Sequence, residues 1–372
     1  MGLLRAVHRW VGITLAAAVA AVALSGGLLL LRDSYYRAVY PSLAEPPGDE
    51  QWARRPDVLQ LIERRWQAEG VRLVRFPRAG LSAYHVWLGD GTEAFVHPRN
   101  GEVIDRWRWH ERLPAFLFEL HAHLLVRPAG EFVNGVLALL TVFLALTGLV
   151  LWWPARRGAF RLRAAWPREA RPGPLLRSHA AVGAMAALPV LLFAVTGAGI
   201  VFYAPLARTM SAAFDGTPPI QPDARVVPQD LPRRPWQDLL AAVDRTWPEG
   251  ELTFYAPPSA ANARLQFRKR LPGEWHPNGR SYVVLDPYDA TVVQAIDARA
   301  QGAGTRLMYA LYPLHAAKIG GLALGVLAAV TSVALTWLAL GGAWTWLARC
   351  TARTQAPRTG ELRPSPAPAE TR

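Results

Sequence analysis

The stretch from Glu119 to Arg157, ELHAHLLVRPAGEFVNGVLALLTVFLALTGLVLWWPARR, decides the fold class. Within it, the run from Phe132 to Trp153 carries no charge. A helix over this run is long enough to cross a hydrocarbon core about 30 Å thick. His121 and His123 stand just before the uncharged run, where a histidine costs free energy unless it has a partner. The stretch therefore predicts a spanning helix with a candidate site at one end.

Three further apolar runs are long enough to span a membrane: Trp10–Leu31, Ala180–Tyr203 and Ile319–Ala348. Between the second and third of the four runs, seven arginines face a single acid, Glu169. Cytoplasmic loops are enriched in arginine, so this loop and both termini are expected on the cytoplasmic side. The loop arginines are Arg156, Arg157, Arg161, Arg163, Arg168, Arg171 and Arg177.

The net charge of +13 is thus a topology signal, and no nucleic-acid partner is expected. The first run could also be a cleaved secretory signal, since Ala21-Val22-Ala23 resembles a cleavage site. Its length favours a retained span. A single cysteine, Cys350, excludes disulfides within the chain, all-cysteine zinc sites and covalently attached c-type haem.

The two long segments between spans have the same pattern. Each begins with a helical periodicity, Trp52–Trp66 and Trp236–Trp247, and continues with four strand-like runs. The runs are Val71–Phe76, Ala83–Leu88, Glu93–Val96 and Glu102–Trp107, then Glu251–Tyr255, Arg264–Phe267, Tyr282–Leu285 and Val292–Ile296. Residues 95–104 align with residues 284–293 without a gap, which predicts a duplicated α+β domain.

Histidines recur in the same register in both halves of the chain. His8 precedes Ser25-Gly26 by the same spacing as His179 precedes Thr196-Gly197, and each landmark is a small residue followed by glycine. His121 and His315 likewise precede Thr147-Gly148 and Gly341-Gly342 by one common spacing. This register favours His121 over its neighbour His123, although a competing register through Gly135–Ala138 and Gly325–Ala328 differs by four residues.

The predicted topology places His8 and His179 at the cytoplasmic ends of their spans and His121 and His315 at the outer ends. Two imidazoles from facing helices, with no carboxylate or cysteine nearby, suit a bis-histidine haem better than zinc, which takes four ligands. Glycines in the spans would let a flat macrocycle or a neighbouring helix approach closely. They are Gly12, Gly26, Gly27, Gly183, Gly197, Gly199, Gly320, Gly321 and Gly325.

Other candidate residues are less specific. His85, His97 and His276 are expected to be surface or strand residues, and His110 is an undecided candidate near the outer pair. The run Phe267–Arg270 could bind an anion, but a solvated strand and turn is the favoured interpretation. Four aromatic residues near the outer mouth could bind a substrate, line an electron path or form an interfacial belt. They are Trp107, Trp109, Tyr309 and Tyr312.

Taken together, these motifs resemble the PepSY-associated transmembrane helix family. The segments that carry the resemblance are His8–Gly12, Leu120-His121 with Leu146–Trp153, His179 with Val195–Gly197, and Leu314-His315 with Lys318–Gly321. Members of this family include iron-regulated bacterial inner-membrane proteins and haem-containing ferric-siderophore reductases. The fourth span departs from the family pattern, because it has Leu340-Gly341-Gly342 where Thr-Gly or Ser-Gly is usual.

The resemblance implies a mainly α membrane protein, a four-helix bundle with two duplicated periplasmic PepSY-like domains. The sequence pattern predicts the bounds: spans at 1–31, 116–154, 178–204 and 307–349, domains at 32–115 and 205–306, an Arg-rich cytoplasmic loop at 155–177 and a disordered cytoplasmic tail at 350–372. The resemblance further implies that His8, His179, His121 and His315 bind haem b, with two haems in all. The tail is too short for the flavin reductase domain of some relatives.

The leading hypothesis is a transmembrane electron carrier that reduces a ferric siderophore or other iron chelate at the periplasmic face. Its electrons would come from a quinol or a flavin reductase. One alternative is a non-redox membrane protein in which the PepSY-like domains bind or regulate a partner. Another is a haem subunit that passes electrons to a separate periplasmic enzyme. No nucleophile triad, phosphate loop or dinucleotide fingerprint occurs in the sequence.

Overall fold

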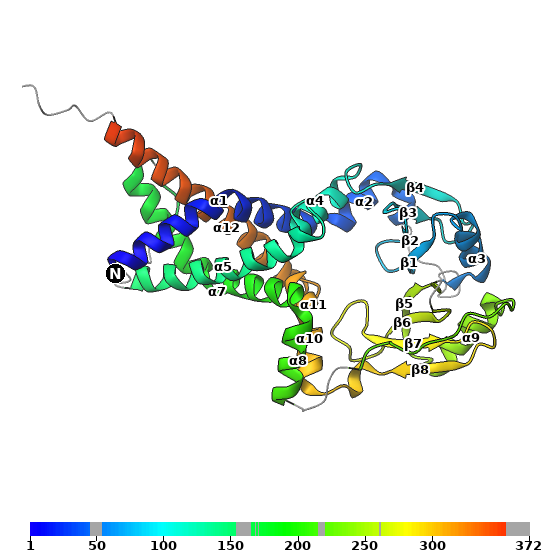
Figure 1. Cartoon of the computed structure of the whole chain (residues 1–372). Helices are drawn as coiled ribbons and strands as arrows, with labels where there is room; N and C mark the ends of the chain where they lie inside the picture. Colours follow the sequence, from blue (N-terminus) through cyan, green and yellow to red (C-terminus); the bar gives the residue numbers. More distant parts are fainter. Residues whose placement is uncertain are drawn as a thin grey trace, which may run out of the picture.

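The computed structural model describes residues 1–44, 54–153, 165–167, 169, 171–214, 220–259 and 262–354. A bundle of long helices forms one part of the molecule, and a β-sheet lies at one end of the bundle (Figure 1). The N-terminus is at the opposite end, far from the sheet (Figure 1). Five arginines of the predicted Arg-rich loop, and the tail from residue 355, lie outside the described residues. These arginines are Arg156, Arg157, Arg161, Arg163 and Arg168.

The bundle consists of four helices, and all four are long and apolar enough to span a membrane, as predicted. They are α1 (Gly2–Leu29), α5 (Ala129–Trp152), α7 (Pro172–Val201) and α12 (Gly321–Thr354). α1 packs along α12, α12 along α7, and α7 along α5, so α1 and α7 stand at opposite corners. Large apolar side chains such as Leu188 and Leu322 face outward, as in a protein whose solvent is lipid.

Two of the predicted spans are interrupted. The predicted span at 116–154 comprises α4 (Leu113–His123) and α5, and the one at 307–349 comprises α10 (Ala303–Tyr309), α11 (Leu311–His315) and α12. Leu124 and Leu125 end α4 in the left-handed region, with φ of 51° and 62°. His121 and His315 therefore lie on short helices that pack on α1 and α7, and not at the edges of the spanning helices.

The strands form one continuous antiparallel sheet in the order β4-β3-β2-β1-β5-β6-β7-β8. Their bounds are β1 (Val71–Arg75), β2 (Tyr84–Leu88), β3 (Glu93–Val96), β4 (Val103–Trp107), β5 (Glu251–Ala256), β6 (Leu265–Arg270), β7 (Ser281–Leu285) and β8 (Val292–Ile296). The strand predictions are therefore confirmed to within a few residues, and the strands of the two long segments join in one sheet. β1 pairs with β5 through Val74 opposite Tyr255 and Arg75 opposite Phe254. With this sheet and the four long helices, the fold class is mixed helix and sheet rather than mainly α.

The terminal hairpins of the two sheet halves have the same local geometry. Val96 pairs with Val103 and Leu285 with Val292, and in both hairpins the register shifts at the preceding residue. The turn residues Gly101 and Ala290 have nearly equal positive φ angles, 68° and 64°. These positions correspond in the gap-free alignment of residues 95–104 with residues 284–293.

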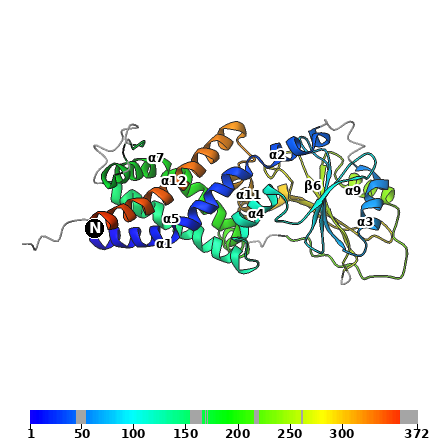
Figure 2. The same ribbon diagram turned by 90° about the horizontal axis from the view of Figure 1, so that it is seen from above.

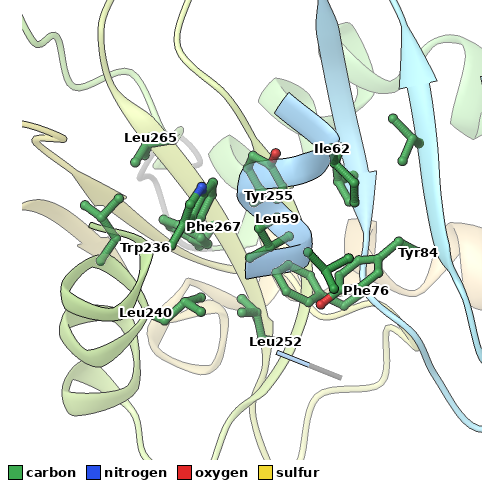
Figure 3. Packing of buried hydrophobic residues seen from close by; sticks show 14 of the residues in the cluster. Leu59, Ile62, Phe76, Tyr84, Trp236, Leu240, Leu252, Tyr255, Leu265 and Phe267 are labelled. Carbon is green, nitrogen blue, oxygen red and sulfur yellow. The ribbon is translucent and has the colours of Figure 1, made fainter. Parts of the chain in front are cut away.

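One face of the sheet is covered by α3 (Pro56–Arg65) and α9 (Trp236–Thr246), on the side away from the bundle (Figures 1 and 2). Leu59 and Ile62 of α3 and Trp236 and Leu240 of α9 pack on strand residues such as Tyr255 (Figure 3). The alternate strand residues point toward the bundle. There α2 (Arg32–Val39) packs Tyr36 on the β3–β4 half.

Lys269, expected on a solvated strand, is fully buried on the α9 side of the sheet. Its ammonium donates to the carbonyls of Val243 (3.3 Å) and Trp247 (2.7 Å), at the C-terminus of α9. Those carbonyls have no partners within the helix, and a cation there also interacts favourably with the helix dipole. The interpretation of this run as solvated is therefore wrong at Lys269, which closes the end of α9.

We expect Lys269→Met to lower the free energy of unfolding by about 1–3 kcal/mol, because the methionine leaves the Val243 carbonyl without this donor and removes one of the two donors to the Trp247 carbonyl. Chemical unfolding of the detergent-purified protein measures this change. The matched control is Arg270→Met on the same strand, where the side chain is exposed; its effect should stay within about 0.5 kcal/mol. Equal losses in both variants would show that Lys269 does not stabilise α9.

His85 and His276 are both buried, with 2% and 3% of their surfaces exposed. His85 lies in β2 between Trp87 and Phe95, and its Nε2 is 2.6 Å from the Glu93 carboxylate. His85 was expected to be a surface or a strand residue, and it is a strand residue. His276 is neither a surface nor a strand residue, because the loop between β6 and β7 folds it against Tyr312. His97 is half-buried.

Burial lowers the pKa of His85 from 6.5 to about 4 despite the hydrogen bond with Glu93. The folded protein therefore keeps this imidazole neutral where the unfolded chain would protonate it. We expect stability to decrease by about 3 kcal/mol from this residue as the pH falls from 6.5 to about 4. Thermal unfolding across this pH range measures the decrease, which should be smaller in His85→Gln. Parallel pH profiles for the two proteins would contradict the assignment.

Candidate functional site

The structure brings together two pairs of histidines inside the bundle. The distal pair is His8 of α1 and His179 of α7, with ring centroids 6.4 Å apart. The sheet-side pair is His121 of α4 and His315 of α11, with ring centroids 5.9 Å apart. Each pair joins one histidine from each half of the chain. These are the partners that the sequence repeat predicts.

The protonation of the sheet-side pair follows from its hydrogen bonds. Nδ1 of His121 is 2.9 Å from the Val22 carbonyl, and Nδ1 of His315 is 3.0 Å from the Phe193 carbonyl. A carbonyl only accepts, so both Nδ1 atoms carry the hydrogen and donate it. In a neutral imidazole the lone pair is then on Nε2, which is the atom available to bind a metal.

The Thr147 hydroxyl gives His8 of the distal pair the same protonation, with the hydrogen on Nδ1. Its hydroxyl donates to the Phe143 carbonyl at 2.8 Å, so the oxygen is left to accept from Nδ1 of His8, also at 2.8 Å. Nδ1 of His179 is buried and makes no hydrogen bond within the described residues, although it faces the backbone of Leu338. His179 is thus the one orphaned imidazole of the two pairs.

Each of the four rings lies against a glycine of a neighbouring helix. A Cβ on Gly26 would stand 2.6 Å from Cε1 of His121, and one on Gly197 would stand 3.0 Å from Cε1 of His315. Gly148 and Gly342 meet His8 and His179 in the same way, at 3.3 Å and 3.4 Å. These are the glycines of the small-residue landmarks in the repeat. Their missing side chains make the room that the imidazoles occupy.

Helix packing accounts for other glycines of the spans. A Cβ on Gly27 would meet the Ser332 side chain at 2.1 Å, so Gly27 allows α1 and α12 to approach. A Cβ on Gly325 would have no neighbour within 4 Å. Gly27 therefore supports the helix-packing interpretation, Gly26 and Gly197 support the interpretation that the glycines make room at the histidines, and Gly325 supports neither.

His123 has a different environment from His121. Its Nδ1 is 3.2 Å from the Glu119 carboxylate, which also pairs with Arg127, and its ring packs on Phe118. The neighbouring His121 faces His315 instead. Asn134 of α5 donates to the His121 carbonyl at 2.6 Å and so ties α4 to the spanning helix. No motif or spacing in the sequence indicates this role for Asn134.

Each pair offers two imidazole nitrogens, which suits a metal ion whose other ligands belong to a cofactor. No group of three or more His, Cys, Asp or Glu side chains that could hold a metal ion occurs in the described part of the chain. Two imidazoles on opposite sides of one metal ion have ring centres about 6 Å apart, since each metal–nitrogen bond is about 2 Å long. Both pairs have about this separation. A haem, whose macrocycle supplies four nitrogens, fits these residues.

The aromatic candidates have diverse environments. Trp107 is 1% exposed and packs on Tyr36 and Phe95, so it offers no open surface to a substrate. Trp109 is exposed, stacks on Phe116 and contacts His110, which joins neither pair. Tyr309 and Tyr312 lie where the helices meet the sheet. Arg280 covers the ring of Tyr309, and His276 stacks on Tyr312 with ring centroids 5.1 Å apart.

Comparison with known proteins places the chain in a family. No curated protein matches it significantly. The family described as the PepSY-associated TM region matches residues 5–349, which include all four histidines of the pairs and the eight strands of the sheet. Together with the four apolar helices, this match identifies a membrane protein, and the chain belongs to the PepSY-associated TM family.

Proposed function

We propose that this protein is a transmembrane electron carrier that holds two b-type haems and reduces a ferric siderophore or another iron chelate at its periplasmic face. One observation carries the proposal. The same arrangement, two imidazoles from the two halves of the chain with each ring against a glycine, occurs at both ends of the bundle. Helix packing alone does not require this repetition.

His8 and His179 would hold one haem, and His121 and His315 the other. A bound haem iron supplies reversible one-electron chemistry. The chain's own residues fix the tautomer: Val22, Phe193 and Thr147 accept from Nδ1, so Nε2 of these histidines would be the atom that binds the iron. Such outer partners orient a ligating histidine and raise its basicity.

We infer that the protein resides in a bacterial inner membrane with both termini in the cytoplasm. The arginine bias of the loop between α5 and α7 supports this orientation. The sheet, at the opposite end of the bundle from the N-terminus, would then be periplasmic (Figure 1). The matching registers of the two terminal hairpins support a duplicated PepSY-like domain, with one copy in 32–115 and the other in 205–306.

The proposed direction of electron transfer is from the distal pair to the sheet-side pair and then to the chelate. A quinol or a flavin reductase would donate the electrons. Each electron converts one Fe(III) to Fe(II), a softer and less charged ion that oxygen-rich chelators hold more weakly. Tyr312, one helical turn before His315 on α11, lies between the sheet and the sheet-side pair and is the candidate contact on this path.

The reduced-minus-oxidised absorption spectrum of the detergent-purified protein tests the proposal. We expect a b-type signal with two haems per chain after expression with adequate haem. A protein without such a signal would be the non-redox binding protein of the first alternative. If the haems are present but reduced protein in liposomes does not reduce ferric chelates, the second alternative, a haem subunit for a separate enzyme, is supported instead.

A further inference from the structure

Three arginines on the bundle-facing side of the sheet have no acidic partner. They are Arg75 of β1, Arg268 of β6 and Arg280, one residue before β7, and none makes an ion pair within the described residues. Nε of Arg280 is buried and has no hydrogen-bond partner among these residues. A partly buried charge normally has a counter-charge. The cluster therefore has an unmet requirement for an anion.

The arginines are held close together by the sheet. The guanidinium groups of Arg75 and Arg268 lie over the same ring, Phe254 of β5, at 5.3 Å and 5.6 Å from its centroid. Arg268 also donates to the Tyr282 hydroxyl at 2.6 Å, and Arg75 donates to the Asn278 amide oxygen at 2.7 Å. These contacts preorganise the two cations across the adjacent strands β1, β5 and β6.

Arg280 ends the loop between β6 and β7, and its guanidinium lies over the Tyr309 ring, 5.5 Å from the ring centroid. Burial lowers the pKa of His276 in this loop to about 2, and the positive charges of Arg280, Arg268 and Arg75 act in the same direction. His276 stacks on Tyr312, three residues after Tyr309 in the chain, so the loop with Arg280 packs against the helices next to the sheet. The pKa of Arg75 is lowered to about 10, first by burial and then by Arg78, so Arg75 still carries its charge at neutral pH.

Acidic side chains near the cluster are already engaged, among them Glu93, which is hydrogen-bonded to His85 opposite Arg75. Glu274 accepts from the backbone amides of Leu271 and Arg280 and from the Ser281 hydroxyl. Asp33 forms an ion pair with Arg78 at 2.8 Å. Neither carboxylate forms an ion pair with the three arginines, so within the described part of the chain the cluster is open to an anionic ligand.

We propose that Arg75, Arg268 and Arg280, with Tyr282 and Tyr312, form the docking site for an iron chelate of net negative charge that presents carboxylate or catecholate oxygens. This inference rests on the proposed function and adds the charge class of its substrate. Guanidinium groups donate in a fork that matches paired oxygens, and tyrosine rings provide flat surfaces for an aromatic chelator. Tyr312 and His315 share α11, so the site adjoins the sheet-side pair.

Gallium(III) citrate is the probe, because it is anionic and is not reduced. We expect calorimetric titration of the full-length protein in detergent to show binding that is about 10- to 100-fold weaker in the double variant Arg268→Gln/Arg280→Gln, through lost charge-assisted hydrogen bonds. Arg268→Lys keeps the charge and should retain most of the affinity. The control is Arg64→Gln on α3, which removes an exposed charge from the opposite side of the sheet and should bind normally.

Undiminished binding in the double variant would overturn the inference, as would equal affinity for the cationic gallium(III) complex of desferrioxamine B. Binding that disappears in phosphatidylglycerol nanodiscs, but not in neutral ones, would assign the cluster to a lipid headgroup and also overturn it. Because gallium takes up no electron, the result does not depend on haem. A normal haem spectrum without gallium citrate binding refutes only this site, whereas binding without a haem signal refutes the proposed function.

Discussion

Alanine in place of His121 or His315 should remove one of two haem signals and leave the other intact. The two imidazoles are the only protein ligands that the proposed sheet-side centre would have, and loss of either exposes one side of the iron. His8→Ala and His179→Ala should have the reciprocal effect on the distal centre. The measurement is the reduced-minus-oxidised spectrum together with haem content per chain, which should fall by about half in each variant.

His123→Ala is the matched control, because His123 is close to His121 in the chain but contacts Glu119 rather than His315. Its spectrum should equal that of the unaltered protein. A lost signal in His123→Ala with a normal spectrum in His121→Ala would reverse the choice between the two residues. Loss of both signals in every single variant would contradict the assignment of two separate centres.

Gly26→Ala should disrupt the sheet-side centre although it adds only a methyl group. The new Cβ would stand 2.6 Å from Cε1 and 2.9 Å from Nδ1 of His121, which is closer than such atoms approach. The ring or the helix must shift, and this shift disturbs the hydrogen bond between His121 and the Val22 carbonyl. Alanine favours a helix over glycine by about 1 kcal/mol, so a loss of haem cannot be attributed to a weakened helix. The expected result is loss or a large shift of one haem signal.

The control for this substitution is Gly325→Ala in α12, where the added methyl group would meet nothing within 4 Å. It should leave both haem signals unchanged and keep or raise the temperature of unfolding. Haem spectra and thermal unfolding of the two variants, measured side by side, decide the matter. An unaltered spectrum in Gly26→Ala would refute the close approach of His121 to α1.

The spans and strands were predictable because their signals are local. An uncharged run as long as Phe132–Trp153 is typical of a membrane span. The residue pattern of Tyr84–Leu88 indicates a strand without information from the rest of the chain. The histidine partners were also predictable, because equal spacings in the two halves of the chain show which histidines correspond. The small residue and glycine at each landmark were visible as well, but only the structure shows that Gly26 makes room for His121.

Features that depend on contacts between distant residues were not predictable. The β1–β5 pairing consists of backbone hydrogen bonds, which leave no mark on side-chain pattern, so the continuous sheet was missed. The left-handed leucines Leu124 and Leu125 resemble any other apolar residues in a run, so the break before α5 was missed too. Lys269 appeared solvated because it belongs to a basic run. Its burial depends on the end of α9, which precedes β5 and β6 in the chain.

The composition of the histidine pairs has a consequence for biosynthesis. His8 and His121 emerge from the ribosome in the first half of the chain, while His179 and His315 follow later, and His315 precedes only the final helix, α12. Gly342, which accommodates His179, lies within that last helix. The surroundings of the distal pair are therefore incomplete on a nascent chain until the last span has been inserted. Cofactor loading would thus act as a checkpoint that distinguishes finished protein from interrupted translation products.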